Sequence, residues 1–170
     1  MDVFETIATK LDVKNYASKH VPDELKRKIL ESARLTGSSM NTQHWRFILV
    51  QDATNLKRLA SDSTTGQWVA NADFAVIILV NSKIPGSYLD GGRVLQDMQV
   101  AAWGYGVGSR LYTGFKEQEM RRDYAIPADL KVEAVLGFGY PAKKVIGRKN
   151  RKPLGELAFS EKYGNPLNLK

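Results

Sequence analysis

Small hydroxyl and amide side chains crowd into residues 37–45, Gly-Ser-Ser-Met-Asn-Thr-Gln-His-Trp. This stretch separates a helical pattern from a strongly β-prone run. Gly37 is expected to let the backbone turn through positive φ where the helix stops. The groups that can both donate and accept hydrogen bonds belong to Ser38, Ser39, Asn41 and Gln43. We expect a loop here that binds a ligand with many polar atoms.

Basic residues supply a second kind of chemistry. Lys10 and Lys14 flank Asp12 near the N-terminus, and residues 143–152 hold six basic residues and no acid. That block carries nearly all of the excess in the chain's formal charge of +7. Such a cluster could hold a phosphate, bind a nucleic-acid backbone or only aid solubility.

Other site chemistries find little support. The chain has no cysteine, which excludes disulfides, thiolate metal sites and cysteine nucleophiles. His20 and His44 lack the spacing of zinc ligands, and no serine lies in a Gly-x-Ser-x-Gly elbow. The glycines of residues 104–108 close a helix instead of opening one, so they predict a helix C-cap and not a dinucleotide fingerprint. We predict no catalytic side chain and no metal site, and His44 either reaches the ligand or simply packs.

Periodicity predicts a mixed α/β core of four strands and five helices. Phe74 to Val80 is apolar on both faces, which is typical of a central strand. An N-terminal helix should bury the stripe of Val3, Ile7 and Leu11. The expected helices are 2–11, 22–36, 55–60, 88–105 and 117–124, and the expected strands are 46–51, 74–80, 107–112 and 132–138.

The length of 170 residues fits one domain, since no repeat or composition shift marks a boundary. The longest apolar run is too short to span a membrane and no leader pattern opens the chain, so we expect a cytoplasmic protein without membrane contact. After Pro141 the sequence shows no strong periodicity over about thirty residues. We expect this extension, about residues 143–170, to wrap a partner subunit.

Three segments, in order, resemble motifs of the nitroreductase family. The Asn-x-Gln-x-Trp segment at 41–45 is similar to its flavin-binding loop, residues 10–14 to its Arg-x-Ser-x-Arg/Lys pattern, and residues 149–154 to its Lys-x-Arg-x-Pro-Leu tail. The resemblance covers nearly the whole chain. It implies an α+β fold, with a central, mostly antiparallel sheet flanked by helices, in a single domain spanning residues 1–170.

The resemblance also implies bound FMN at the interface of a homodimer. Asp12 stands where the family usually has serine, and a carboxylate about 5 Å from the phosphate would cost about 3 kcal/mol unless it pairs with Lys10 or Lys14. Gln67 either faces the polar edge of the flavin ring or belongs to a surface loop. By resemblance, Lys10, Lys14, Lys149 and Arg151 hold the phosphate, Ser38, Ser39 and Asn41 of the partner subunit contact the ribityl chain and ring, and the backbone of Thr113 and Gly114 faces flavin N5.

The function implied is an FMN-dependent oxidoreductase with ping-pong kinetics. NADH or NADPH would donate hydride, and a small-molecule acceptor such as a nitroaromatic or quinone would receive the electrons. Trp68 and Tyr88 would either stack on aromatic substrates or pack in the dimer core. Specialised members of the family remove halogens, dehydrogenate peptides or fragment flavin, and the sequence does not separate these reactions.

A third hypothesis is a polyanion-binding protein without cofactor, which would use the basic block of residues 143–152. It is disfavoured for nucleic acid, because the chain has no recognised nucleic-acid motif and no aromatics interleaved with that block.

Overall fold

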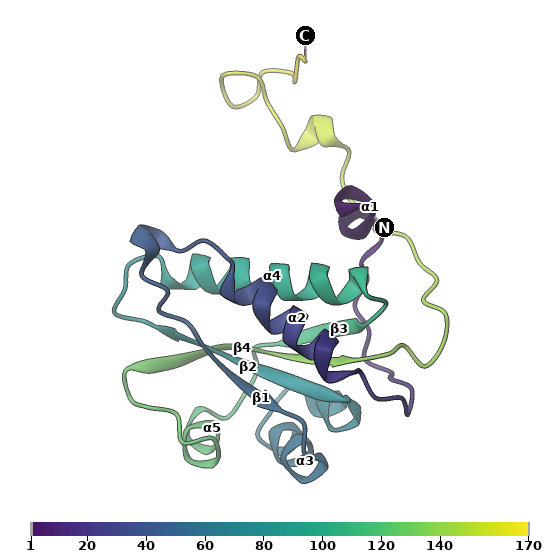
Figure 1. Ribbon diagram of the computed structural model, residues 1–170. Coiled ribbons are helices and arrows are strands. Elements are labelled where there is room, and N and C mark those ends of the chain that lie inside the picture. The colour runs from purple at the N-terminus through teal and green to yellow at the C-terminus, as the bar shows by residue number, and fades with distance from the viewer. Residues whose placement is uncertain (1, 170) are drawn as a thin grey trace.

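The computed structural model describes residues 2–169, which fold around one four-stranded antiparallel sheet (Figure 1). The expected α+β class is confirmed, and each expected helix and strand is present with ends that differ by a few residues. In space the strands follow the order β1-β2-β4-β3. The elements are α1 (Val3–Thr9), α2 (Asp23–Arg34), η1 (Ser39–Asn41), β1 (Arg46–Val50), α3 (Ala53–Ser61), η2 (Gln67–Asn71), β2 (Phe74–Asn81), α4 (Ser87–Gly104), β3 (Gly108–Tyr112), α5 (Glu117–Asp123), β4 (Leu130–Gly139) and η3 (Leu154–Glu156).

The central strand β2 is buried along nearly its whole length, as its continuous apolar run predicted. Helices cover both faces of the sheet, with α2 and α4 on one side and α3 and α5 on the other (Figure 1). On the α2/α4 side the Phe74 ring stacks on Phe138 with centroids 4.7 Å apart. On the other side Ile77 packs in a cluster with Leu59 and Met120. Both layers therefore pack on the sheet whose edge strand is β3.

Helix α4 crosses the sheet and is about 27 Å long. Its buried face carries Val94, Met98 and Ala102, in agreement with the predicted spacing. The glycine-rich stretch after it is a helix C-cap, as expected: Gly106 has a φ of +74°, and the Val107 N–H donates to the Ala102 carbonyl. The two ends of α4 mark the two parts of the candidate site described below.

Two local predictions around α2 are wrong. The helix begins at Asp23 instead of the expected residue 22, and Pro22 is its N-cap. Positive φ occurs not at Gly37 but at Met40, Asn41 and Gln43, with φ values of 50°, 55° and 46°. The chain leaves the helix through ordinary backbone, and the tight turn comes later, inside η1.

The N-terminal helix does not bury its predicted apolar stripe. Val3 and Ile7 are 74% and 44% exposed, and the buried residue of α1 is Thr6. The reason is that α1 packs mainly against the C-terminal end of α4, where Trp103 Nε1 donates to Thr9 Oγ1 over 3.0 Å. An apolar face of α1 is therefore left uncovered within this chain.

The segment after β4 leaves the body of the molecule and projects beyond α1 (Figure 1). Most of its large apolar side chains are exposed, and Tyr163 is exposed over 93% of its surface. Within residues 2–169, every helix falls short of the combined length and hydrophobicity that a membrane crossing requires. That the extension wraps a partner subunit stays a prediction.

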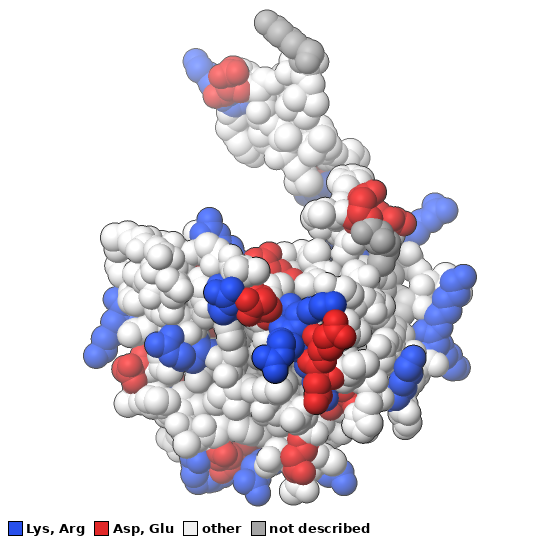
Figure 2. Space-filling model, in the orientation of Figure 1, with Lys and Arg blue, Asp and Glu red and all other residues white. Residues whose placement is uncertain are grey.

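Charge is distributed over the surface as the sequence predicted. Over α2, basic and acidic side chains alternate in ion pairs such as Lys28 with Glu24 at 2.8 Å (Figure 2). Along the right edge of the view, where the segment after β4 runs, basic side chains predominate (Figures 1 and 2). This agrees with the six basic residues that the sequence gathers in residues 143–152.

Candidate functional site

The N-terminal segment of residues 10–14 lies along the edge strand β3. Val13 donates its N–H to the Ser109 carbonyl over 3.0 Å, and Asp12 forms an isolated parallel bridge with Ser109. Gly108 makes this approach possible, because a Cβ at that position would lie 2.7 Å from Val13 Cβ. The first strand residue is therefore glycine for a packing reason, and the basic segment is placed beside the sheet edge.

Four charged residues from the two ends of the chain meet beside this segment. Lys10 Nζ lies 2.6 Å from Asp12 Oδ1. Lys149 Nζ donates to the Ile7 carbonyl in the last turn of α1, which ties the tail to the N-terminal helix. Burial, then Arg151 and Lys10, lower the pKa of Lys149, while Asp12 opposes that shift. We call Lys10, Asp12, Lys149 and Arg151 the cationic cradle.

The donor set of the cationic cradle fits a phosphate group. Three cations and one carboxylate leave two positive charges, close to the charge of about −1.5 to −2 on a phosphate monoester at neutral pH. The crowding of like charges also suits an anionic ligand, since Arg151 and Lys10 both lower the Lys149 pKa. Asp12 pairs with Lys10, as one sequence hypothesis held, and its side chain is 56% exposed. Pairing and solvent together reduce its repulsion toward a bound phosphate.

Lys14 lies beside the cationic cradle. Its side chain is exposed, and it lines a cavity of about 390 Å³ together with Asp12, Pro141 and Lys143. Lys14 can thus approach a ligand in the cradle from the neighbouring cavity.

Thr113 and Gly114 follow the other end of β3. The Gly114 carbonyl accepts the Thr64 N–H over 2.8 Å. A Cβ at Gly114 would lie 2.5 Å from Thr64 Oγ1, so the close approach of the two loops accounts for this glycine. Gln67 belongs to the same pair of loops, is exposed, and donates from Nε2 to the Ser63 carbonyl over 3.2 Å. Thr113 and Gly114 therefore lie beside the loop of Thr64, and Gln67 begins η2 three residues after Thr64.

The strand between these two groups sets their separation. From Ser109, beside Asp12, to Thr113 the backbone extends about 13 Å. An elongated ligand with a phosphate at one end and a polar ring at the other suits that spacing. The candidate site thus extends along the edge of β3.

The polar loop of residues 37–44 lies elsewhere, at the N-terminal end of α4. Within it, the Gln43 N–H donates to Ser38 Oγ over 3.0 Å, and Gln43 Nε2 donates to Asn41 Oδ1 over 3.1 Å. Met40 and Asn41 are exposed and, with Gln43, adopt left-handed backbone. Such backbone costs about 1–2 kcal/mol for each residue that is not glycine, so contacts with the rest of the fold must hold it.

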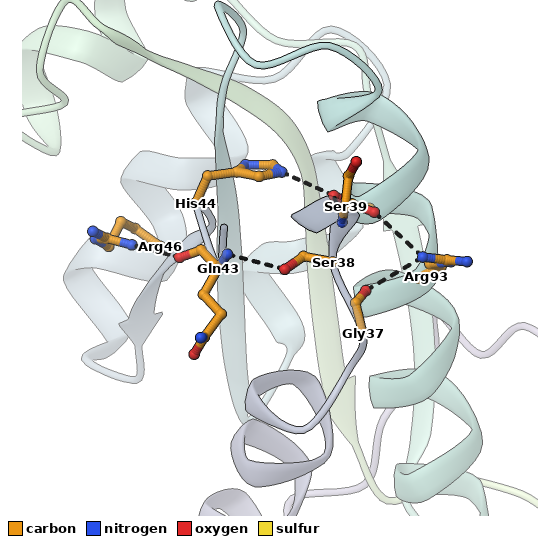
Figure 3. A network of polar contacts seen from close by, with 8 residues as sticks. Gly37, Ser38, Ser39, Gln43, His44, Arg46 and Arg93 are labelled. Atoms are coloured by element: carbon orange, nitrogen blue, oxygen red, sulfur yellow. Dashed lines mark hydrogen bonds and ion pairs between the residues drawn. The ribbon is translucent and has the colours of Figure 1, made fainter. Parts of the chain in front are cut away.

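Asp90 and Arg93 are site residues that the sequence reasoning missed. Asp90 is 1% exposed, and its Oδ2 accepts the Ser39 N–H over 3.0 Å (Figure 3). His44 packs inside the protein, one of the two predicted alternatives, with Nε2 3.2 Å from Asp90 Oδ2. The only signal in the sequence was a carboxylate three residues before an arginine on a mostly apolar helix.

Within one chain, the polar loop and the cationic cradle lie toward opposite ends of α4. Asp90 and Trp103 mark the two ends, and they lie about 20 Å apart along α4. Figure 1 shows α1 beyond one end of α4 and the short helix η1 near the other. Ser38, Ser39 and Asn41 are therefore remote from Lys149 and Arg151 of the same chain.

The two aromatic candidates differ in environment. Trp68 packs edge-on against Tyr112 with centroids 5.9 Å apart, and the Arg110 guanidinium lies 5.8 Å from its ring centre. Tyr88 is 71% exposed beside the polar loop. Packing within the chain thus accounts for Trp68, whereas Tyr88 is open to a ligand or a partner.

Sequence comparison places the chain in a known family. The model of the nitroreductase family matches residues 7–84. A protein from Methanothermobacter thermautotrophicus, named as a candidate NADH dehydrogenase/NAD(P)H nitroreductase, is 32% identical over an alignment of 152 positions that covers 84% of this chain and 79% of the relative. The chain belongs to the nitroreductase family, a family of oxidoreductases.

Solved structures show the same fold. An FMN-dependent nitroreductase from Clostridium difficile R20291 superposes with a TM-score of 0.86 at 21% identity, covering 94% of this chain and 99% of the other. A candidate nitroreductase from Desulfovibrio desulfuricans, solved in complex with FMN, has a TM-score of 0.84 at 24% identity and covers 96% and 98% of the two chains. The antiparallel sheet with helices on both faces is thus the nitroreductase fold.

Proposed function

We propose that the protein is an FMN-dependent oxidoreductase that takes hydride from NADH or NADPH and reduces a small-molecule acceptor. The observation that carries the proposal is the cationic cradle, whose two net positive charges match a phosphate monoester. Family membership and the FMN complex of a structural neighbour support FMN as the ligand.

The chain's own residues would bind and orient the cofactor. Lys10, Lys149 and Arg151 would hold its phosphate, with Lys14 approaching from the adjacent cavity. The backbone of Thr113 and Gly114, with Gln67 nearby, would face the ring at the far end of β3. When bound, FMN would supply the redox chemistry at N5, passing the hydride to a nitroaromatic, a quinone or a related acceptor in a ping-pong cycle.

We further propose a homodimer of single nitroreductase-like domains, with the extension of residues 143–170 wrapping the partner. Two observations support it. The polar loop and the cationic cradle lie toward opposite ends of α4, along which Asp90 and Trp103 are about 20 Å apart, and apolar side chains of α1 and of the extension are uncovered. A second copy would bring Ser38, Ser39 and Asn41 of the partner subunit to the flavin.

The test is a visible spectrum of the purified protein after addition of FMN and desalting. Retained flavin that NADH or NADPH bleaches under anaerobic conditions, and that a nitroaromatic or quinone reoxidises, is the expected result. Light scattering on the same sample should give the mass of a dimer. A colourless protein that retains neither FMN nor riboflavin would refute the proposed function and turn attention to polyanion binding by the basic block.

A further inference from the structure

We propose that Asp90 is a positioning residue that holds the polar loop of residues 37–44 in its ligand-binding shape. The inference rests on the proposed flavin function of that loop. It assigns a role to a buried carboxylate that would itself touch neither flavin nor substrate.

The contacts of Asp90 reach both ends of the polar loop. Oδ2 accepts the Ser39 N–H over 3.0 Å and lies 3.2 Å from His44 Nε2. Oδ1 lies 3.4 Å from Arg93 Nη1, and the same nitrogen of Arg93 is 3.5 Å from the Gly37 carbonyl. Figure 3 shows these contacts converging from the loop and from α4. Asp90 therefore holds the segment directly at Ser39 and His44, and through Arg93 at Gly37.

The surroundings of Asp90 make it a firm anchor. A buried carboxylate is tolerated only when its oxygens are hydrogen-bonded, and Asp90 meets that condition on both oxygens. It lies in the first turn of α4, where the helix dipole favours negative charge. Its backbone belongs to a long helix packed on the sheet, and sites supported by rigid elements keep their geometry.

The internal bonds of the polar loop cannot replace this anchor. Those from Gln43 to Ser38 and Asn41 fix the curvature of the loop, yet they attach it to nothing else. Left-handed backbone at three positions is unfavourable, so an unattached loop would relax to other conformations. The contacts with Asp90 join the strained segment to the core while Ser39 and Asn41 remain exposed. The polar groups of the loop are thus preorganised for a ligand.

The experiment compares Asp90→Asn with Asp97→Asn. Asp97 lies on the same helix and accepts from Thr36 Oγ1 over 2.6 Å, outside the polar loop, so it is a matched control for loss of one carboxylate. Dissociation constants for FMN and riboflavin are measured by flavin fluorescence, with the visible spectrum of the bound flavin and the melting temperature of the apoprotein. We expect Asp90→Asn to weaken both flavins by a similar factor of about ten, since a hydrogen bond to a charged group is lost.

A merely structural role for Asp90 would lower the melting temperature without changing the spectrum of the bound ring. Loss of positioning should change that spectrum in the flavin-loaded protein, with Asp97→Asn close to wild type. Unchanged affinity and spectrum in Asp90→Asn would overturn the proposal.

If Asp90→Asn fails to fold, a second pair of variants tests the same contact. Ser39→Pro removes the N–H that bonds Asp90, and the site accepts proline because Ser38 is extended with ψ of 156° and Ser39 opens η1. Ser39→Ala removes the same hydroxyl but keeps the N–H. Weaker flavin binding in Ser39→Pro than in Ser39→Ala is expected, and equal binding would contradict the role of Asp90.

Amide hydrogen exchange of the apoprotein separates this proposal from the proposed function. Loop amides such as that of Gln43 should exchange faster in Asp90→Asn than in Asp97→Asn, whether or not flavin binds. A wild-type protein that binds no flavin would refute the function alone. Equal exchange in both variants would refute the anchor alone.

Discussion

The two ends of α4 present ligand-binding groups by different physical means. At the N-terminal end, the polar loop is held by hydrogen bonds to the buried Asp90 carboxylate. At the C-terminal end, the cationic cradle consists of partly or fully exposed side chains that influence one another mainly through charge. The first region is specified by geometry and the second by electrostatics.

This difference determines how strongly salt and pH affect the interactions in each region. Interactions among exposed charges are screened by salt and change with protonation, whereas buried hydrogen bonds are screened far less. FMN and riboflavin differ only in the phosphate, so comparing them separates the two regions in one experiment.

The largest effect is expected from Arg151→Ala. Loss of a guanidinium that can bind phosphate through two N–H groups should weaken FMN binding on the order of 100-fold and leave riboflavin almost unchanged. Lys144→Ala removes the same charge from the basic block outside the cradle and serves as control. Asn41→Ala, in the polar loop, should instead weaken both flavins. If Arg151→Ala bound FMN like wild type, the cradle would not be the phosphate site.

A smaller effect should follow pH. In the free protein, burial together with Arg151 and Lys10 places the Lys149 pKa below its ordinary value. Phosphate stabilises the charged form, so FMN affinity is full while Lys149 is protonated and falls as pH rises through that lowered pKa, by about tenfold for the loss of one charge-assisted bond. Titrations from pH 7 upward measure this. The affinity for riboflavin should not decline with pH. In Lys149→Arg, the affinity for FMN should not decline either. A decline of FMN affinity that persists in Lys149→Arg would mean that another group titrates.

Asp62 tests whether hydrogen bonding decides if a buried carboxylate stabilises the folded state. Unlike Asp90, it has a buried oxygen, Oδ2, without a hydrogen-bond partner, and burial and Asp123 raise its pKa. Because a raised carboxyl pKa destabilises the folded state above the unfolded value near 3.9, Asp62→Asn should increase the free energy of unfolding at pH 7 by about 1 kcal/mol.

Urea denaturation measures the effect of Asp62→Asn, and the gain should shrink as pH falls toward about 4, where both states of the wild type become protonated. Asp90→Asn should have the opposite sign at pH 7. The same sign in both variants would mean that hydrogen bonding does not distinguish the two carboxylates.

The smallest effect is expected from Asp12→Ser. Asp12 is more than half exposed and paired with Lys10, so its removal should strengthen FMN binding only about threefold at low salt, in line with the worth of an exposed ion pair. The gain should vanish at high salt, where exposed charges are screened. Weaker binding in Asp12→Ser would show instead that Asp12 orients Lys10 toward the phosphate.

Much of the fold could be predicted because its signals are local. The apolar run of β2 and the helical spacing of Met98 and Ala102 need only neighbouring residues, and the structure confirms both. The stripe of Val3 and Ile7 was predicted to be buried and is exposed, since burial depends on a partner surface that this chain does not supply. Periodicity thus indicates an element and its apolar face, and not what covers that face.

For the candidate site, the sequence by itself determined the types of group: cations at both chain ends, a loop of hydroxyl and amide side chains, and no cysteine or metal-ligand pattern. The tertiary structure decided which of them meet. It joined Lys149 to α1 and Asp12 to Lys10, separated the polar loop from the cationic cradle by the length of α4, and placed Asp90 beneath the loop. The physical reason is that each residue type fixes the chemistry of its own side chain, whereas burial and charge pairing arise only where distant segments pack.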